Sequence, residues 1–403
     1  MTDKNSNTNY YSRPGNNRDP INNDRPDTAD EIKEQTEAQK VKSESAVADL
    51  DGGDLKINPK TNRNKLMEVK NLHIAYNTDR GKLHAVNGVD FSIYNNETTA
   101  VIGESGCGKT TLCLALLKLT EKNARYLSGE IIYQGDEQEK NILKLDEGEL
   151  RKLRWSDISL VFQASQSVFN PVIKIKEHFI DTVRAHQRGL SAKKILKRAR
   201  NLLEQMQLDA DRVLSSYAHE LSGGMKQRTL IALSFILEPK IVIFDEPTTA
   251  LDVLTQRKIL DLLKTIKEKN DFSLIIITHD LAISAELADN VATMYAGKIV
   301  EYGPVESIYY QPRHPYSYGL IKAVPKIVAG KGEEGLTSIT GKPPDLIEIQ
   351  EQCSFAPRCD FASSKCYNTI PSLNNIAEGH QVACFNYQEV PSIKDGSHVQ
   401  NSD

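Results

Sequence analysis

The stretch GESGCGKTT, residues 103–111, follows a short apolar run and precedes an apolar helical pattern. It fits the spacing G-x-x-x-x-G-K-[ST], in which glycines let backbone N–H groups turn inward around an anionic phosphate. Lys109 is expected to reach the β- and γ-phosphates, and the Thr110 hydroxyl to hold Mg²⁺. The plain alternative is a glycine-rich turn with a surface lysine, but the strand–loop–helix setting favours a phosphate site. The residues expected to contact the nucleotide are Gly103, Ser105, Gly106, Cys107, Gly108, Lys109, Thr110 and Thr111.

A second apolar run, IVIFDEP at residues 241–247, ends in two carboxylates. Asp245 is expected to orient Mg²⁺. Glu246 is expected to polarise the water that attacks the γ-phosphate, a general-base role worth ~10²–10⁴ in rate. Two carboxylates at a strand end can also be a solvated terminus, but the phosphate loop upstream favours the catalytic interpretation.

Short runs rich in Ile and Val alternate with helical patterns along the chain. Such runs are typical of parallel strands buried on both faces, and their alternation with helices predicts an α/β core. The mostly helical span 179–237 predicts a subdomain that projects from this core. Strands are expected at 65–76, 90–95, 98–105, 158–163, 240–247 and 272–280, and helices at 110–119, 176–208, 222–237, 254–269 and 280–288.

Composition places this chain among soluble proteins. Its 403 residues are 39% hydrophobic and 26% charged, and a net charge of −4 gives no global reason to expect nucleic-acid binding. Residues 1–64 are polar and almost free of large apolar groups, which predicts a disordered extension, and 391–403 are predicted to be a disordered tail. No apolar run approaches the roughly 18 residues that span a bilayer. A cytoplasmic protein with at most peripheral membrane attachment is therefore expected.

The segment LSGGMKQR at 221–228 poses a physical problem at its helix start. Ser222 is a good N-cap, but Gly223 and Gly224 cost helix stability and leave backbone N–H groups bare. With the motifs above, this segment resembles the signature of the ATP-binding cassette (ABC) transport ATPases, and the resemblance covers Leu66 to about Tyr310. It implies a P-loop NTPase fold over residues 65–310, with a RecA-like core, an antiparallel β subdomain and a helical subdomain.

The resemblance also implies roles for single residues. Tyr76 would stack on adenine, Gln163 would contact Mg²⁺ and the attacking water, and His279 would contact the γ-phosphate. TALD at 249–252 is similar to the loop that contacts the second cassette. In this family two cassettes pack head to tail around ATP, so the bare donors would meet the triphosphate of the partner. The signature residues expected there are Ser222, Gly223, Gly224 and Gln227. A sibling chain is the expected partner, and a second copy is the alternative.

The C-terminal region, predicted at 311–390, contains HPYSYGL at 314–320, GKPPDL at 341–346 and four cysteines. These features resemble the C-terminal region of the oligopeptide, dipeptide and nickel importer ATPases, where HPYSYGL is expected to be a packing element. The four cysteines, by the same resemblance, ligate a [4Fe–4S] cluster; they are Cys353, Cys359, Cys366 and Cys384. Zinc, with His380 as a substitute ligand, is one alternative, although C-x-x-C pairs are missing. Disulfides or unpaired thiols are the other.

The resemblance implies peptide import through two transmembrane permease subunits, with an external solute-binding protein and with this chain on the cytoplasmic side of the membrane. A nickel or sugar importer with the same tail is an alternative, as is a regulatory adaptor that binds ATP without turnover; Glu246 argues against the adaptor. A DNA-repair ATPase would carry long coiled-coil arms between loop and signature, where no sustained heptads occur. A translation-associated protein would normally carry two phosphate loops, and one is present.

Overall fold

The computed structural model describes residues 64–135, 138–162, 168–247, 251–323, 339–347 and 351–393. Several predicted features lie outside the described residues: the N-terminal extension up to residue 63, Gln163, the first two residues of TALD and the tail from residue 394. No helix of the described part is long and apolar enough to cross a bilayer.

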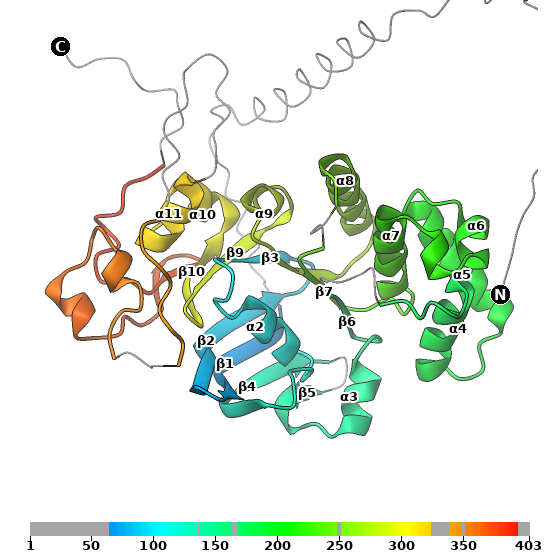
Figure 1. The fold of residues 1–403 in the computed structure, drawn as a ribbon, viewed down its shortest axis with the longest axis horizontal. Coiled ribbons are helices and arrows are strands. Elements are labelled where there is room, and N and C mark those ends of the chain that lie inside the picture. The colour runs from blue at the N-terminus through cyan, green and yellow to red at the C-terminus, as the bar shows by residue number, and fades with distance from the viewer. Residues whose placement is uncertain are drawn as a thin grey trace, which may run out of the picture. The chain divides into compact units, whose positions relative to one another are not determined.

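The main sheet has the strand order β11-β12-β10-β9-β3-β8-β7-β6 (Figure 1). Strands β9, β3, β8, β7 and β6 run parallel, whereas β10, β12 and β11 are antiparallel. Every residue of β3, β7 and β8 is buried, which agrees with their Ile- and Val-rich sequences. The bounds are β3 Thr98–Ile102, β6 Ile158–Val161, β7 Ile241–Asp245, β8 Ser273–Ile277, β9 Asn290–Tyr295 and β10 Lys298–Pro304.

A second, antiparallel sheet has the order β2-β1-β4-β5. One hydrophobic cluster joins this sheet to α2 and the main sheet, with Val86, Leu112, Ile131 and Ile243 among its members. The first turn of α2 is therefore held between the two sheets. The bounds are β1 Lys65–Thr78, β2 Gly81–Tyr94, α2 Lys109–Ala115, β4 Ala124–Gln134, β5 Glu139–Asn141 and α3 Glu147–Leu153.

The helical subdomain consists of α4 to α7, which lie together beyond β6 in Figure 1. Their bounds are α4 Ile175–His186, α5 Ala192–Gln205, α6 Ala210–Ser215 and α7 Gly223–Ser234. The helical pattern 176–208 was predicted without an interruption, but it forms two helices, since α4 ends at His186 and Gly189 takes a left-handed φ of 96°. Helices α8, Val253–Lys269, and α9, Leu281–Leu287, agree closely with the predicted spans. The predicted α/β fold with antiparallel and helical subdomains is confirmed.

The C-terminal region continues the main sheet. Strand β12 pairs with β10, and the fully buried carboxylate of Glu301 in β10 ties several segments together. It accepts hydrogen bonds from the backbone N–H groups of Arg313 (2.6 Å) and His314 (3.0 Å) and from Nε2 of His380 (2.8 Å). The elements are α10 Val305–Tyr310, α11 Pro315–Lys322, 3₁₀ turns Ala356–Arg358 and Ser364–Tyr367, β11 Asn374–Ala377 and β12 His380–Val382.

Candidate functional site

The carboxyl ends of three neighbouring parallel strands define the candidate nucleotide site. The loop 103–108 follows β3, Asp245 ends β7, and His279 lies just after β8. Ligands of parallel α/β sheets bind at this edge, where loops and helix N-termini are exposed together. The topology therefore brings the predicted phosphate loop and the predicted catalytic residues to one place.

Two glycines of the phosphate loop occupy positions that no other residue fits. Gly103 has a φ of 150°, and a Cβ atom there would lie 2.2 Å from the carbonyl oxygen of Met294. Gly108 has a φ of 107°, and its Cβ would lie 2.1 Å from the carbonyl oxygen of Ala85. The loop is thus packed tightly against β9 and β2, whereas Ser105 and Gly106 at its tip are exposed.

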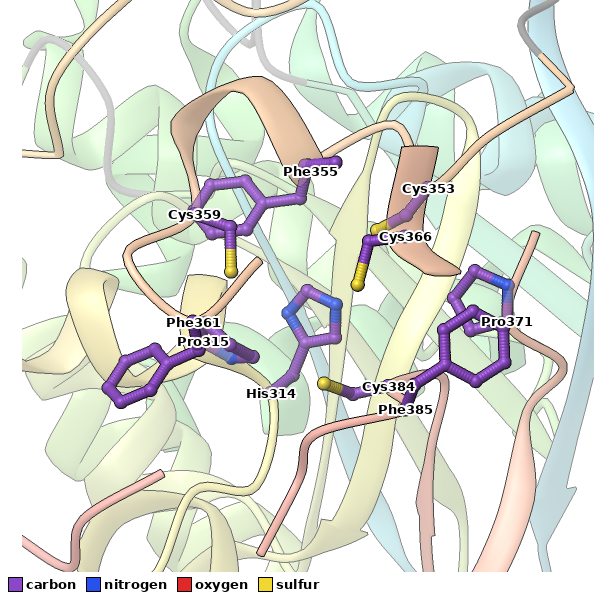
Figure 2. Close-up of a pocket in the computed structure, with 11 residues that line it drawn as sticks. His314, Pro315, Cys353, Phe355, Cys359, Phe361, Cys366, Pro371, Cys384 and Phe385 are labelled. Carbon is purple, nitrogen blue, oxygen red and sulfur yellow. The ribbon is translucent and has the colours of Figure 1, made fainter. Parts of the chain in front are cut away.

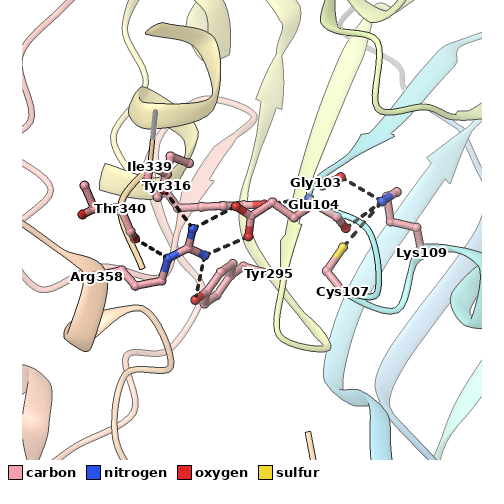
Figure 3. Close-up of polar contacts among 9 residues, drawn as sticks. All are labelled: Gly103, Glu104, Cys107, Lys109, Tyr295, Tyr316, Ile339, Thr340 and Arg358. Carbon is pink, nitrogen blue, oxygen red and sulfur yellow. Dashed lines mark hydrogen bonds and ion pairs between the residues drawn. The ribbon is translucent and has the colours of Figure 1, made fainter. Parts of the chain in front are cut away.

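Lys109 is buried against the loop and is only 6% exposed. Its Nζ donates to the carbonyl oxygens of Gly103 at 2.8 Å and Glu104 at 2.9 Å, and it lies 3.8 Å from the sulfur of Cys107 (Figure 3). Burial raises the pKa of the Cys107 thiol, so this cysteine behaves as a small buried group. The ammonium group is placed where phosphate oxygens can replace the loop carbonyls as its acceptors.

The oxygen atoms expected to hold Mg²⁺ are close together. The Thr110 hydroxyl donates to Oδ1 of Asp245 at 3.4 Å, and Asp245 is only 3% exposed. Burial raises the pKa of Asp245, and the nearby carboxylate of Glu246 raises it further. The hydrogen bond from Thr110 and the positive charge of Lys109 act in the opposite direction and lower the pKa. A buried carboxylate with a neighbouring hydroxyl fits Mg²⁺, which prefers hard oxygen ligands and would stabilise the charged form.

Glu246 and His279 form a pair beside this oxygen cluster. Oε1 of Glu246 lies 3.2 Å from Nδ1 of His279, and their side chains are 18% and 63% exposed. Glu246 takes a left-handed φ of 49°, and its N–H donates to the carbonyl of Ile277 in β8 at 2.9 Å. Residues other than glycine rarely adopt this backbone conformation, and here it occurs directly after β7.

Tyr76, predicted to stack on adenine, lies in β1 next to the first turn of α2. Its hydroxyl is 3.2 Å from the Thr111 hydroxyl, which places the ring beside the phosphate loop. Gln163 lies outside the described residues.

The signature residues occupy a different part of the chain. Ser222 caps α7 through its hydroxyl, which accepts from the N–H of Met225 at 3.4 Å, and it is exposed. Gly224 lies against α8, since a Cβ there would be 2.8 Å from Cγ2 of Thr255, and Gln227 is buried. In Figure 1, α7 is grouped with α4 to α6, and β6 and β7 separate it from α2. Among the contacts of the described residues, none joins Ser222, Gly223 or Gly224 to the phosphate loop of the same chain.

All four C-terminal cysteines line one pocket, together with His314 and several aromatic residues (Figure 2). All six cysteines of the chain are free thiols. Burial and the neighbouring cysteines raise the pKa of Cys359 to about 11 and that of Cys384 to about 12. Within the described residues, no three His, Cys, Asp or Glu side chains are grouped closely enough to hold a single metal ion.

The sequence suggested His380 and not His314 as a residue of the cysteine pocket, and the structure shows the reverse. His380, the suggested substitute zinc ligand, does not line the pocket and instead contacts Glu301. His314 does line it, and sequence reasoning missed this because HPYSYGL was interpreted only as packing. Its Nδ1 accepts from the N–H of Tyr316 at 3.1 Å, and burial lowers its pKa to about 3, so the ring is neutral. The packing expectation for the motif agrees with the full burial of Tyr316.

Two family profiles match this chain. Residues 86–249 match the family described as ABC transporter. Residues 300–366 match the family described as oligopeptide/dipeptide transporter, C-terminal region.

Several curated proteins are similar over most of their length. The dipeptide transport ATP-binding protein DppD of Caldanaerobacter subterraneus is 41% identical over 82% of this chain and 99% of its own. The protein of the same name from Bacillus subtilis is 39% identical over 80% of this chain and 94% of its own. The Bacillus subtilis oligopeptide transport ATP-binding protein OppD is 39% identical over 79% of this chain and 88% of its own.

Solved structures with a similar fold are ABC cassettes. A dimeric bacterial ABC transporter cassette is 26% identical with a TM-score of 0.53, over 59% of this chain and 98% of its own. A subunit of a Clostridium perfringens ABC transporter complex is 28% identical with a TM-score of 0.51, over 61% of this chain and 90% of its own.

Proposed function

Because the chain belongs to the ABC transporter family of oligopeptide and dipeptide ATP-binding subunits, we propose that it hydrolyses ATP to drive peptide uptake through partner membrane subunits. The observation that carries the proposal is the convergence of the phosphate loop, Asp245, Glu246 and His279 at one sheet edge. A regulatory adaptor without turnover has no need for an oriented carboxylate there.

Each residue of this edge has a proposed task. The loop N–H groups and Lys109 bind the β- and γ-phosphates, and Thr110 and Asp245 hold Mg²⁺, which would neutralise phosphate charge. Glu246 accepts the proton of the attacking water, with His279 orienting its carboxylate and reaching the γ-phosphate. Tyr76 stacks on the adenine ring. Gln163 is assigned to Mg²⁺ and the attacking water by family resemblance.

The site is proposed to be completed by a second cassette. Ser222, Gly223 and Gly224 form the start of α7, with Gln227 buried in the same helix, and they would contact the triphosphate held by the second cassette. Backbone donors without a Cβ, at the positive end of a helix, favour close approach to an anion. A sibling ATPase is the proposed partner, and a second copy is the alternative. A similar solved cassette is itself dimeric.

The remaining partners follow from the family. We assign peptide passage to two transmembrane permease subunits and solute capture to an external binding protein. The chain would attach peripherally to the cytoplasmic side of the membrane. Nucleic acid is not among the proposed partners.

Reconstitution of the purified complex in proteoliposomes tests the transport function. In vesicles whose ATPase subunits face the lumen, ATP enclosed in the lumen should drive uptake of labelled dipeptides and oligopeptides. A complex that carries Glu246→Gln should not support this uptake. Nickel chelates and sugars form the other arms of the substrate panel. If ATP turnover were accompanied by uptake of nickel chelates or sugars but not of peptides, the transported substrate would be nickel or sugar instead of peptide. An absence of ATP turnover in the intact complex would contradict the enzymatic proposal.

We also propose that the four cysteines hold a [4Fe–4S] cluster, which would fix the surrounding loops and carry redox chemistry when bound. All four sulfurs line one pocket, which supports a shared ligand. Within the described residues, no three His, Cys, Asp or Glu side chains are grouped to hold a metal ion, so the shared pocket and the family resemblance are what support the cluster.

Metal analysis after anaerobic purification tests the cluster. About four iron atoms per chain are expected, with loss of iron in Cys384→Ser. Cys113→Ala is the control, because Cys113 is a buried cysteine of α2 that does not line the pocket. Stoichiometric zinc without iron, or iron retained in Cys384→Ser, would contradict the assignment.

A further inference from the structure

Two residues of the C-terminal region hold one residue of the phosphate loop. The guanidinium of Arg358 donates to both carboxylate oxygens of Glu104, from Nη1 at 2.8 Å and from Nη2 at 2.9 Å (Figure 3). The hydroxyl of Tyr316 accepts the backbone N–H of Glu104 at 2.8 Å. Glu104 is therefore fixed at its side chain and at its backbone by residues more than 200 positions later in the chain, since the two separations are 254 and 212.

The Arg358 side chain is itself fixed. It is only 4% exposed, and its Nε donates to the carbonyl of Thr340 at 2.8 Å. Its guanidinium carbon lies 5.7 Å from the ring centre of Tyr295, and Nη1 is 3.3 Å from the hydroxyl of the same residue. The hydrogen bonds to Glu104 raise the pKa of Arg358 above its already high ordinary value, so the guanidinium keeps its positive charge. A two-bond pair with one buried partner is directional and resists rearrangement.

Glu104 connects this pair to the phosphate site. Its carbonyl oxygen accepts from Nζ of Lys109 at 2.9 Å, and Gly103 directly before it accepts from the same atom. A shift of Glu104 would therefore displace the lysine acceptors and the loop N–H groups together.

Arg358 is next in sequence to Cys359, one of the cysteines that line the pocket. It ends the 3₁₀ turn Ala356–Arg358, which lies between two pocket cysteines, Cys353 and Cys359. Phe355, which lines the pocket, packs on the rings of Tyr295 and Tyr316 at 5.3 and 5.5 Å between centres. The pocket wall and the two residues that hold Glu104 thus form one packed unit.

We propose that Arg358 and Tyr316 are positioning residues for the phosphate-binding loop, and that through them the occupancy of the cysteine pocket sets nucleotide affinity. The first half, the positioning role of Arg358 and Tyr316, follows from the hydrogen bonds that these two residues make with Glu104. The second half rests on the proposed function, because it treats the four cysteines as a site that is loaded or empty.

Nucleotide titration of the full chain with a fluorescent ATP analogue tests the first half. Arg358→Gln should bind about tenfold more weakly, equivalent to about 1.4 kcal/mol. In the intact complex, KM for ATP should rise by more than kcat falls. Tyr316→Phe, which removes only the hydroxyl acceptor, should weaken binding in the same direction. Arg358→Lys should be intermediate, because lysine keeps the charge but not the two parallel bonds.

A double-substitution cycle separates positioning from general damage to the fold. If the pair acts as a unit, Glu104→Gln combined with Arg358→Gln should bind about as weakly as either single variant. Arg80→Gln is the matched control, because Arg80 and Asp345 also join the cassette to the C-terminal region but form an exposed pair that includes no phosphate-loop residue. Wild-type affinity in Arg358→Gln and Tyr316→Phe, or the same loss in Arg80→Gln, would overturn the proposal.

Titration of the iron-loaded and chelator-treated wild type tests the second half. The emptied chain should bind the ATP analogue more weakly, and this difference should disappear in Arg358→Gln. Equal affinities of the loaded and emptied chains would refute the coupling. A wild-type chain purified anaerobically without iron would instead contradict the cluster, and the Arg358 result would stand by itself.

Discussion

Nδ1 of His279 lies 3.2 Å from Oε1 of Glu246, although 33 residues separate them. They meet because β7 and β8 are parallel neighbours whose carboxyl ends share one edge. The sequence places each residue after an apolar strand, and strand pairing then sets the contact. The contact holds the Glu246 carboxylate at the strand edge where the phosphate loop also lies.

Glu246→Gln should slow ATP turnover by ~10²–10⁴ while ATP-dependent dimerisation persists. Glutamine keeps the size and polarity of the side chain but cannot accept the proton of the attacking water. Steady-state phosphate release and size-exclusion chromatography with ATP measure the two effects. Unchanged turnover would exclude Glu246 as the base, and a variant unable to dimerise with ATP would show that the carboxylate has another role.

Gly108→Ala should abolish nucleotide binding and lower the free energy of unfolding by about 2 kcal/mol more than Gly106→Ala. Both glycines have a positive φ, but only a Cβ at Gly108 would collide, at 2.1 Å from the Ala85 carbonyl oxygen. No heavy atom lies within 4 Å of a Cβ built at Gly106, so this variant shows backbone strain alone. Denaturant unfolding compares the two variants, and equal losses would contradict a steric origin.

Glu301→Gln should destabilise the chain by about 3 kcal/mol, because the buried carboxylate accepts from three donors. Glutamine offers one oxygen, and its amide group would face a backbone or imidazole N–H. Asp345→Asn is the control: its exposed pair with Arg80 should contribute about 0–1 kcal/mol. Thermal unfolding midpoints measure both, and similar shifts in the two variants would argue against a buried network.

Acidification from pH 7 to 5.5 should cost wild type about 1 kcal/mol more stability than His314→Asn at equal metal content. Burial lowers the pKa of folded His314 to about 3, whereas the unfolded value is near 6.5. Between these values the unfolded state binds more protons, so stability is lost as the pH falls below about 6.5. Asparagine can keep the helix cap without titrating. Parallel pH curves for the two proteins would show that the pKa of His314 is the same in the folded and unfolded states.

Much of the candidate site could be predicted because its signals are local. The loop 103–111 carries its glycines, lysine and hydroxyl in one continuous motif, and the Ile- and Val-rich runs identify β3, β6, β7 and β8. Prediction was weaker where the pattern was less distinctive. β4, β9 and β10 were not identified, and the break between α4 and α5 was missed because apolar spacing continues across it.

The sequence by itself determined the phosphate loop, the buried parallel strands and the carboxylates that follow them, because each depends on neighbouring residues and their period. Only the tertiary structure decided that Arg358 reaches Glu104, that His314 rather than His380 lines the cysteine pocket, and that β12 extends the main sheet. These contacts join residues far apart in the chain. Their partners are chosen by strand order and packing, which no short stretch of sequence encodes.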